Sequence, residues 1–163
     1  MQARRFHLAE FNISRLKAPL DSPVMKEFVD FLEPVNRFAE ESTGYVWRLV
    51  APDGQASSYL PPAFEDEMIV TNLTVWEDIE SLKNFVYQTV HTYFLRSRKK
   101  WFEQVSDRQV VLWWIPKGHL PTLEEAKEKL RCLQEIGPGP DAFTFQDLFD
   151  SEGNPILPGL RGS

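Results

Sequence analysis

Cysteine is almost absent from this chain of 163 residues, which contains only Cys132. A single cysteine excludes an intramolecular disulfide framework and any zinc site built from cysteine ligands. Long hydrophobic runs are also missing, so we expect no membrane-spanning segment and no membrane partner. The first residues lack the apolar core of a secretion signal, which leads us to expect a cytoplasmic protein.

A surplus of positive charge is missing too, because 18 Lys and Arg stand against 24 Asp and Glu for a formal net charge of -6. Proteins that bind the phosphate backbone usually carry a basic surplus, so no nucleic-acid partner is expected. The chain has no Gly-rich phosphate loop, no Gly-x-Ser-x-Gly elbow and no paired-carboxylate pattern. These absences disfavour nucleotide binding and serine-hydrolase chemistry. No two histidines have metal-ligand spacing, and we predict no metal site.

Aromatic residues, in contrast, are abundant, with 12 Phe, 5 Trp and 4 Tyr. Composition alone leaves open whether these rings fill a bulky core or form the walls of a pocket. The length and the 42% hydrophobic content indicate a single domain over residues 1–163. We expect its core at about 5–136, followed by a Pro/Gly-rich tail at 137–163 that docks on the body.

Hydrophobic periodicity predicts strands at 6–13, 45–51, 67–76 and 108–116 and helices at 22–44, 78–107 and 122–137. Pro34 should kink the first helix, and the second changes its apolar face near residue 90. Thr122 and Glu125 form a capping box at the start of the third, which Gly137 should end. The irregular stretch 52–66 is either a lid or a plain surface insertion.

This order of elements fits an α+β fold of the ferredoxin-like βαββαβ type. We therefore expect a four-stranded antiparallel sheet with helices on one face, plus a C-terminal helix and tail. The other sheet face would carry Trp76 and the pair Trp113 and Trp114, and an apolar face of this kind does not stay bare in water. A homodimer that packs sheet against sheet is the expected cover.

Polar residues on otherwise apolar strands indicate where a cavity lies. On the helix side they would be buried without partners, so we expect them on the helix-free face. The residues selected in this way are Glu10, Asn12, Asn72, Thr74 and Trp76. Trp47 and Arg48 point in opposite directions, and both stay candidates. Cross-strand hydrogen bonding is the competing explanation for the asparagines, and plain packing is the competing explanation for Trp76 and Trp114.

Histidines and a basic run supply further candidates. His91 lies near Arg98, and a base in an aromatic pocket has a pKa suited to proton abstraction. We expect His7 in the core on the helix side and His119 in a structural hydrogen bond of its loop. The basic run Arg96, Arg98, Lys99 and Lys100 reads as a solvated helix face. The alternative is that Arg98 reaches an anionic group of a substrate.

Several segments carry a resemblance to the dimeric α/β-barrel superfamily, which includes antibiotic-biosynthesis monooxygenases, haem-degrading monooxygenases and EthD-like proteins. Within that superfamily, the chain resembles a family catalogued only as a domain of unknown function. The segments are HLAEFN (7–12), GYVWRL (44–49), VWEDIESL (75–82), WWIPKGHLP (113–121) and, in the tail, GP (137–138) and AFTF (142–145). The resemblance runs from about residue 6 to residue 145. It implies a dimeric α/β barrel.

The resemblance also implies site residues. Haem-degrading members place Asn on the first strand and Trp at the end of the third, which Asn12 and Trp76 match in kind and place. Their histidine falls at Phe85 and Val86, and His91 comes more than a turn later. That departure disfavours haem ligation, so we expect no cofactor and keep haem as the alternative. Cofactor-independent members need no such ligand, and Asn12, Trp76 and His91 could then orient a substrate and take its proton.

The function expected from these features is that of an enzyme acting on a hydrophobic or aromatic small molecule. The resemblance implies a cofactor-independent, monooxygenase-like oxidation of a phenol or anthrone. In that branch of the superfamily the conjugate base of the substrate passes an electron to oxygen directly. The alternatives are a non-oxidative cyclase, dehydratase or isomerase that uses the same pocket by acid–base catalysis, and a non-catalytic dimeric protein that binds a ligand or haem. The substrate-binding candidates are Glu10, Trp47, Arg48, Asn72, Thr74, Arg98 and Trp114.

Overall fold

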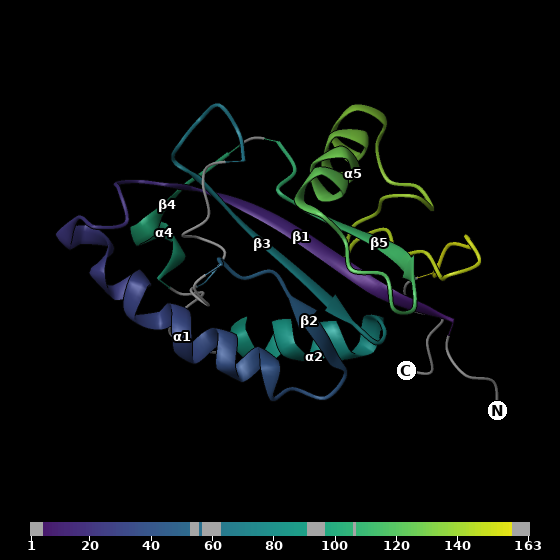
Figure 1. The fold of residues 1–163 in the computed structure, drawn as a ribbon. Coiled ribbons are helices and arrows are strands. Elements are labelled where there is room, and N and C mark those ends of the chain that lie inside the picture. Colours follow the sequence, from purple (N-terminus) through teal and green to yellow (C-terminus); the bar gives the residue numbers. More distant parts are fainter. Residues whose placement is uncertain (1–4, 53–55, 57–62, 91–96, 106, 158–163) are drawn as a thin grey trace.

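The computed structural model describes residues 5–52, 56, 63–90, 97–105 and 107–157. It contains one antiparallel sheet with helices packed around it (Figure 1). The strands are β1 (Phe6–Leu16), β2 (Tyr45–Arg48), β3 (Ile69–Trp76), β4 (Phe102–Glu103) and β5 (Val110–Pro116). The helices are a 3-10 turn (Pro23–Met25), α1 (Lys26–Glu40), α2 (Ile79–Val90), α4 (Arg98–Trp101) and α5 (Leu123–Ile136). None of the helices among these residues is long and apolar enough to cross a bilayer.

Strand β1 is the centre of the sheet. It pairs with β3 along one side, with Glu10 opposite Thr74 and Asn12 opposite Asn72. Along its other side it pairs first with β5 and then, at its end, with the short β4. Strand β2 extends the sheet beyond β3. The predicted α+β class is confirmed, with five strands where the sequence predicts four.

The two faces of the sheet follow from the alternation of side chains along its strands. One face is apolar and packs against Ala126, Leu130 and Leu133 of α5. Its buried residues include Ala9, Phe11, Leu73, Val75, Val111 and Trp113. The opposite face packs against α1 and α2, with Leu8 and Trp76 against Ala39 and Leu82. Figure 1 shows α5 on one side of the sheet and α1 and α2 on the other.

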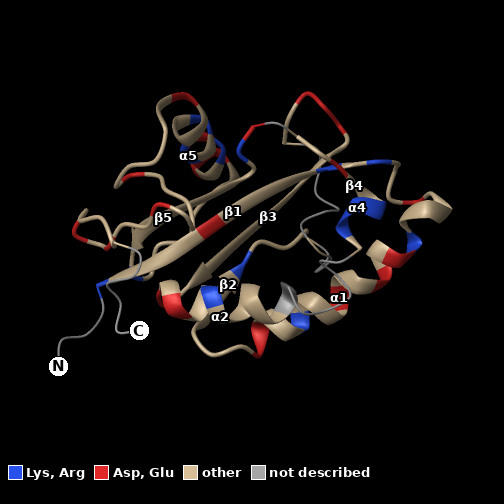
Figure 2. Ribbon diagram, turned by 180° about the vertical axis from the view of Figure 1, so that it is seen from behind, with Lys and Arg blue, Asp and Glu red and all other residues tan. Residues whose placement is uncertain are grey.

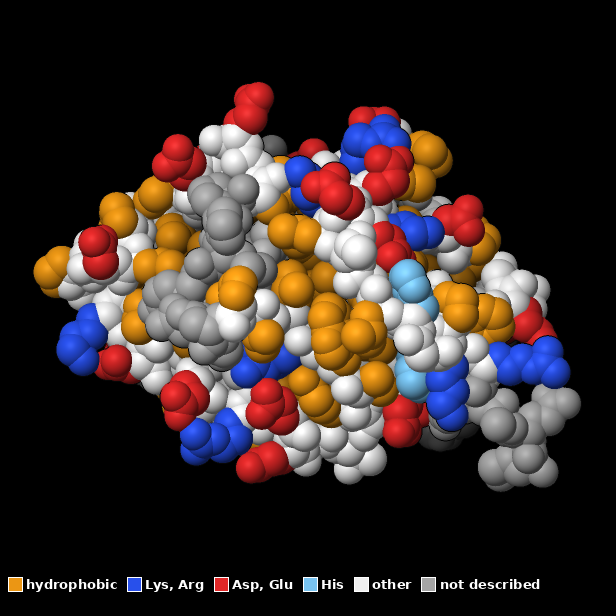
Figure 3. Space-filling model, viewed as in Figure 1, with side chains coloured by type: hydrophobic (Ala, Val, Ile, Leu, Met, Phe, Trp, Pro, Cys, Tyr) orange, Lys and Arg blue, Asp and Glu red, His pale blue; other side chains and the backbone are white. Residues whose placement is uncertain are grey.

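Helices α1 and α2 share one face of the sheet, and the C-terminal helix α5 lies on the other. The face opposite α1 and α2, for which we expected a second copy as cover, is instead packed under α5 of the same chain, where Phe11, Leu73 and Trp113 are at most 1% exposed. The argument for a homodimer through an open sheet face loses its premise. Apolar surface does remain over β2, where Val46 and Trp47 are only partly buried, and Figure 3 shows apolar side chains in this region with charged ones around them.

The single helix expected over 78–107 is also wrong. The described part of α2 is Ile79–Val90, and after the undescribed residues 91–96 the chain forms the short α4 and then the strand β4. The apolar residues after the break have their own partners, because Trp101 and Phe102 pack in a separate cluster with Phe28 of α1. The apolar residues on the second face thus belong in part to α4 and β4 rather than to α2.

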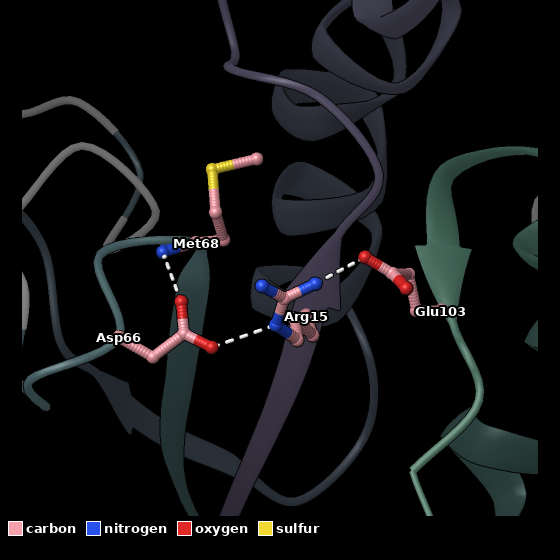
Figure 4. Close-up of polar contacts among 4 residues, drawn as sticks. All are labelled: Arg15, Asp66, Met68 and Glu103. Atoms are coloured by element: carbon pink, nitrogen blue, oxygen red, sulfur yellow. Dashed lines mark hydrogen bonds and ion pairs between the residues drawn. The ribbon is translucent and has the colours of Figure 1, made fainter.

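An ion-pair network holds the far end of β1, which runs three residues beyond the predicted strand. Arg15 Nε donates to Asp66 Oδ2 at 2.6 Å, and Arg15 Nη1 pairs with Glu103 of β4. Asp66 Oδ1 also accepts from the backbone N–H of Met68 at 2.9 Å, just before β3 (Figure 4). The two neighbours of β1 at this end are therefore tied to one guanidinium.

Part of the tail packs on the sheet. The backbone groups of Phe143 and Leu112 exchange two hydrogen bonds of 2.9 Å, and Trp114 Nε1 donates to the carbonyl of Phe149 at 2.9 Å. The predicted N-cap of α5 is confirmed, since Thr122 Oγ1 accepts from the N–H of Glu125 at 3.1 Å. The Glu125 carboxylate bonds to Trp113 and His119.

We predict that Phe143→Ala lowers the free energy of unfolding by about 3 to 5 kcal/mol, because its ring is fully buried in the cluster that contains Leu8, Trp76 and Leu112. Urea unfolding measures the change. Ile136→Ala is the matched control, since Ile136 is 80% exposed and should change stability by less than about 0.5 kcal/mol. Equal stability of the two variants would show that the tail is not part of the folded unit.

Candidate functional site

A cavity of about 330 Å³ lies between the sheet and α1, at the lower end of the range for small-molecule sites. Its walls are largely apolar and come from four parts of the chain: Phe28, Leu32 and Val35 of α1, Phe85 and Val86 of α2, Phe102 of β4 and Phe145 of the tail. Asn72 also lines the cavity and is exposed, so the cavity opens there to solvent. The shape and chemistry suit an apolar ligand with a few polar groups.

Six of the residues selected from the sequence line this cavity: Glu10, Asn12, Arg48, Asn72, Thr74 and Arg98. The five on strands share one face because they occupy matching registers of neighbouring strands, whereas Arg98 reaches the cavity from α4. The predicted location on a helix-free face is wrong, since α1 and α2 cover this face. Polar side chains are tolerated on this face because the helices leave a cavity beside the sheet instead of covering it completely.

Three tryptophans selected from the sequence do not line the cavity. Trp76 is fully buried, stacks on Phe85 at 5.1 Å and donates through Nε1 to Thr74 Oγ1 at 2.9 Å. Trp114 bonds to the tail, and Trp47 packs with the cluster under α5. Trp76 therefore acts on the cavity only through Thr74 and Phe85. The choice left open on the second strand is resolved, with Arg48 on the cavity side.

His91 lies outside the described residues, so its predicted role stays a prediction. His119 forms the structural bond expected of it, at 2.8 Å from Nε2 to Glu125 Oε1, and Glu125 also accepts from Trp113 Nε1. His7 is paired with Ile115 and lies on the face under α5. Within the part of the chain that the structure describes, no three His, Cys, Asp or Glu side chains converge on one point.

Glu10 is the chemically distinctive group of the cavity. It lies in the middle of β1 and is only 7% exposed (Figure 2 shows an acidic position on this otherwise mostly uncharged strand). Asn12 Nδ2 donates to its Oε2 at 2.7 Å, and Thr74 Oγ1 donates to its Oε1 at 3.2 Å. Each carboxylate oxygen therefore has a donor, and the hydroxyl of Thr74 is in turn held by Trp76.

The surroundings of Glu10 shift its affinity for a proton. Burial raises the pKa of the Glu10 carboxyl from 4.5 to about 7, and the hydrogen bonds from Asn12 and Thr74 offset part of this increase by favouring the ionised form. A carboxyl with a pKa near neutrality is present in both protonation states at ordinary pH. It can therefore take a proton from a ligand in the cavity and return it.

Arg98 contradicts the expectation of a solvated basic face. Its guanidinium is half-buried at the cavity, where Nη2 donates to Ser14 Oγ at 3.4 Å and the charge lies 4.8 Å from the centre of the Phe102 ring. Burial lowers the pKa of the Arg98 guanidinium below its usual value. Lys99 and Lys100 of the same short helix are exposed, as expected. The rest of the basic run, Arg96, lies outside the described residues.

Some wall residues were not identified from the sequence as site residues. Phe28 and Val35 belong to a helical stripe that predicts core packing, and Phe145 belongs to a tail expected only to dock. No pattern in the sequence separates a residue that fills a core from one that borders a cavity. Ser14 is a partial exception, because it is a polar residue at the same strand period as Glu10 and Asn12.

A comparison with protein families finds a model that matches residues 7–156, almost the whole chain, and it is described as Domain of unknown function (DUF3291). No curated protein matches the chain. The family match agrees with the resemblance to a family without an assigned activity. Because this family has no assigned function, only the residues of the cavity indicate a chemistry.

We predict that Glu10→Gln changes the dependence of stability on pH. Because the folded state raises the pKa of Glu10, wild-type stability falls as pH rises from 4.5 through about 7. The variant lacks this loss, so its stability relative to wild type should improve by up to about 3 kcal/mol across that window. Urea unfolding at several pH values measures the difference.

Glu80→Gln, at an exposed position of α2, controls for the loss of one negative charge. A stability difference between Glu10→Gln and wild type that stays constant from pH 4.5 to 8 would contradict the raised pKa.

Proposed function

The chain belongs to the DUF3291 family, and we propose that it is a small-molecule enzyme in which Glu10 exchanges a proton with an apolar substrate held between the sheet and α1. The observation that carries the proposal is a buried carboxyl that faces a cavity and has a pKa of about 7. General bases work best when their pKa lies near the working pH. A structural carboxyl would gain more from an ion pair, and Glu10 has two neutral donors instead.

The proposed step is proton abstraction. One oxygen of the Glu10 carboxylate takes a proton from an acidic O–H or C–H of the substrate, and the bonding electron pair stays on the substrate as a phenolate or enolate. Asn12 and Thr74 hold the carboxylate so that the oxygens keep one orientation. The apolar wall formed by Phe28, Phe85 and Phe145 keeps water from competing for the proton.

The monooxygenase-like oxidation expected from the resemblance begins with this same step. In such a reaction the substrate anion passes an electron to oxygen, whereas a cyclase, dehydratase or isomerase returns the proton to another atom. The strand order β2-β3-β1-β5 supports the ferredoxin-like fold of the dimeric α/β-barrel superfamily, which we include in the proposal. A dimer through the sheet face is not included, because α5 buries that face.

Haem is not part of the proposal. Phe85 and Val86 line the cavity at the place where haem-degrading relatives carry their histidine, and neither side chain has an atom that could ligate iron. The donors present in the cavity suit an organic substrate better than a metal centre. Carboxylate, amide, hydroxyl and guanidinium groups converge there without a thiolate or imidazole among the described lining residues.

The test is hydrogen exchange into candidate substrates. In D2O, a panel of phenols, anthrones and 1,3-diketones is incubated with the protein, and deuterium incorporation is followed by mass spectrometry. We expect at least one class to exchange faster with wild type, and Glu10→Gln to slow that exchange by about 10²-fold or more. Glu80→Gln should exchange at the wild-type rate.

Oxygen uptake measured in parallel separates the two chemistries. Uptake that depends on Glu10 identifies the monooxygenase-like oxidation, and exchange without uptake identifies the non-oxidative reaction. Exchange that continues unchanged in Glu10→Gln, or no exchange with any class, would contradict the proposal.

A further inference from the structure

Arg98 brings a positive charge to the cavity, and no carboxylate of the described residues pairs with it. Among the described residues, no carboxylate lies within ion-pair distance of its guanidinium. Its described partners are one long hydrogen bond to Ser14 and the face of Phe102. A guanidinium has five N–H donors, so most of its hydrogen-bonding capacity is left for a ligand.

The other arginine of the cavity differs in this respect. Arg48 Nε lies 2.7 Å from Glu40 Oε2, so its charge is already balanced by a carboxylate of α1. Glu10 does not balance Arg98 either, because the two groups lie at different ends of the cavity. Of the two arginines described in this cavity, Arg98 is therefore the one whose half-buried charge an incoming anion would stabilise more.

We propose that the substrate of this cavity is an organic anion, whose oxyanion group is held by Arg98 while the group that loses its proton lies at Glu10. The inference rests on the proposed function and adds the class of substrate to it. The bound group is a carboxylate or another oxyanion of similar shape, since a guanidinium fork matches two acceptor oxygens in one plane.

The strand register sets the length of this substrate. Ser14, the partner of Arg98, and Glu10 point to the same side of β1 and are four residues apart. At about 3.3 Å per residue the two ends lie about 13 Å apart along the strand. Between them the cavity is lined by Phe28 and Val35 on the helix side, which suits an apolar body between an anionic head and an acidic O–H or C–H.

The experiment compares two fluorescent probes that differ in one group. The first, 8-anilinonaphthalene-1-sulfonate, carries an oxyanion, and the second, N-phenyl-1-naphthylamine, has the same rings without it. We expect Arg98→Gln to weaken binding of the sulfonate probe by about tenfold or more and to leave binding of the neutral probe within about twofold. Arg98→Lys keeps the charge and should retain part of the preference for the sulfonate.

Lys99→Gln removes one positive charge from an exposed position of the same short helix and should bind both probes like wild type. Equal binding of the sulfonate probe by wild type and Arg98→Gln would overturn the inference, as would the absence of saturable sulfonate binding. An equal loss of both probes in Arg98→Gln, with Arg98→Lys also unselective, would overturn it too, because Arg98 would then shape the cavity rather than hold an anion.

The two proposals can fail separately. If deuterium exchange needs Glu10 while sulfonate binding ignores Arg98, the substrate class is wrong and the proposed function stands. If sulfonate binding needs Arg98 while deuterium exchange does not need Glu10, the proposed acid–base function is wrong. The substrate assignment is then wrong as well, and only anion binding by Arg98 remains.

Discussion

The alternation of side chains along β1 is the constraint on which the rest of the structure depends. Residues at one parity, such as Ala9 and Phe11, are apolar and are sealed under α5. Residues at the other parity include Glu10, Asn12 and Ser14, and a sealed core would leave these polar groups without enough partners. The helices on that side therefore border a cavity, and the central strand separates a closed half of the molecule from a hollow one.

Within the hollow half, the polar groups are arranged by strand pairing rather than by loops. Thr74 reaches Glu10 because the two residues are directly paired across β1 and β3. Trp76, next on the same face, holds the Thr74 hydroxyl and packs against Phe85. A large buried ring thus helps to orient a carboxyl through the threonine hydroxyl between them. Sites built on strands in this way are held more rigidly than sites on loops.

Sequence periodicity predicts which residues share a face, and for that reason Glu10, Asn12, Asn72 and Thr74 were grouped together. It does not predict what covers a face, because that depends on the path of connections, so the cover by α5 was missed. The short strand at Phe102–Glu103 is not predicted, because residues 91–101 contain no Gly or Pro to interrupt the helical pattern. With the helix continued, Arg98 was assigned to a solvated face. The same holds for the tryptophans of the sheet. Periodicity predicts their strand positions, but it does not predict which residues they pack against.

The central claim is that the fold keeps one carboxyl of β1 able to hold or release a proton near neutrality. A carbon-13 NMR titration of the Glu10 carboxyl carbon, assigned by its absence in Glu10→Gln, tests this directly. The account predicts an apparent pKa of about 7 for that resonance. A midpoint near the ordinary value of 4.5 would show that the carboxyl is solvated, and it would contradict the account.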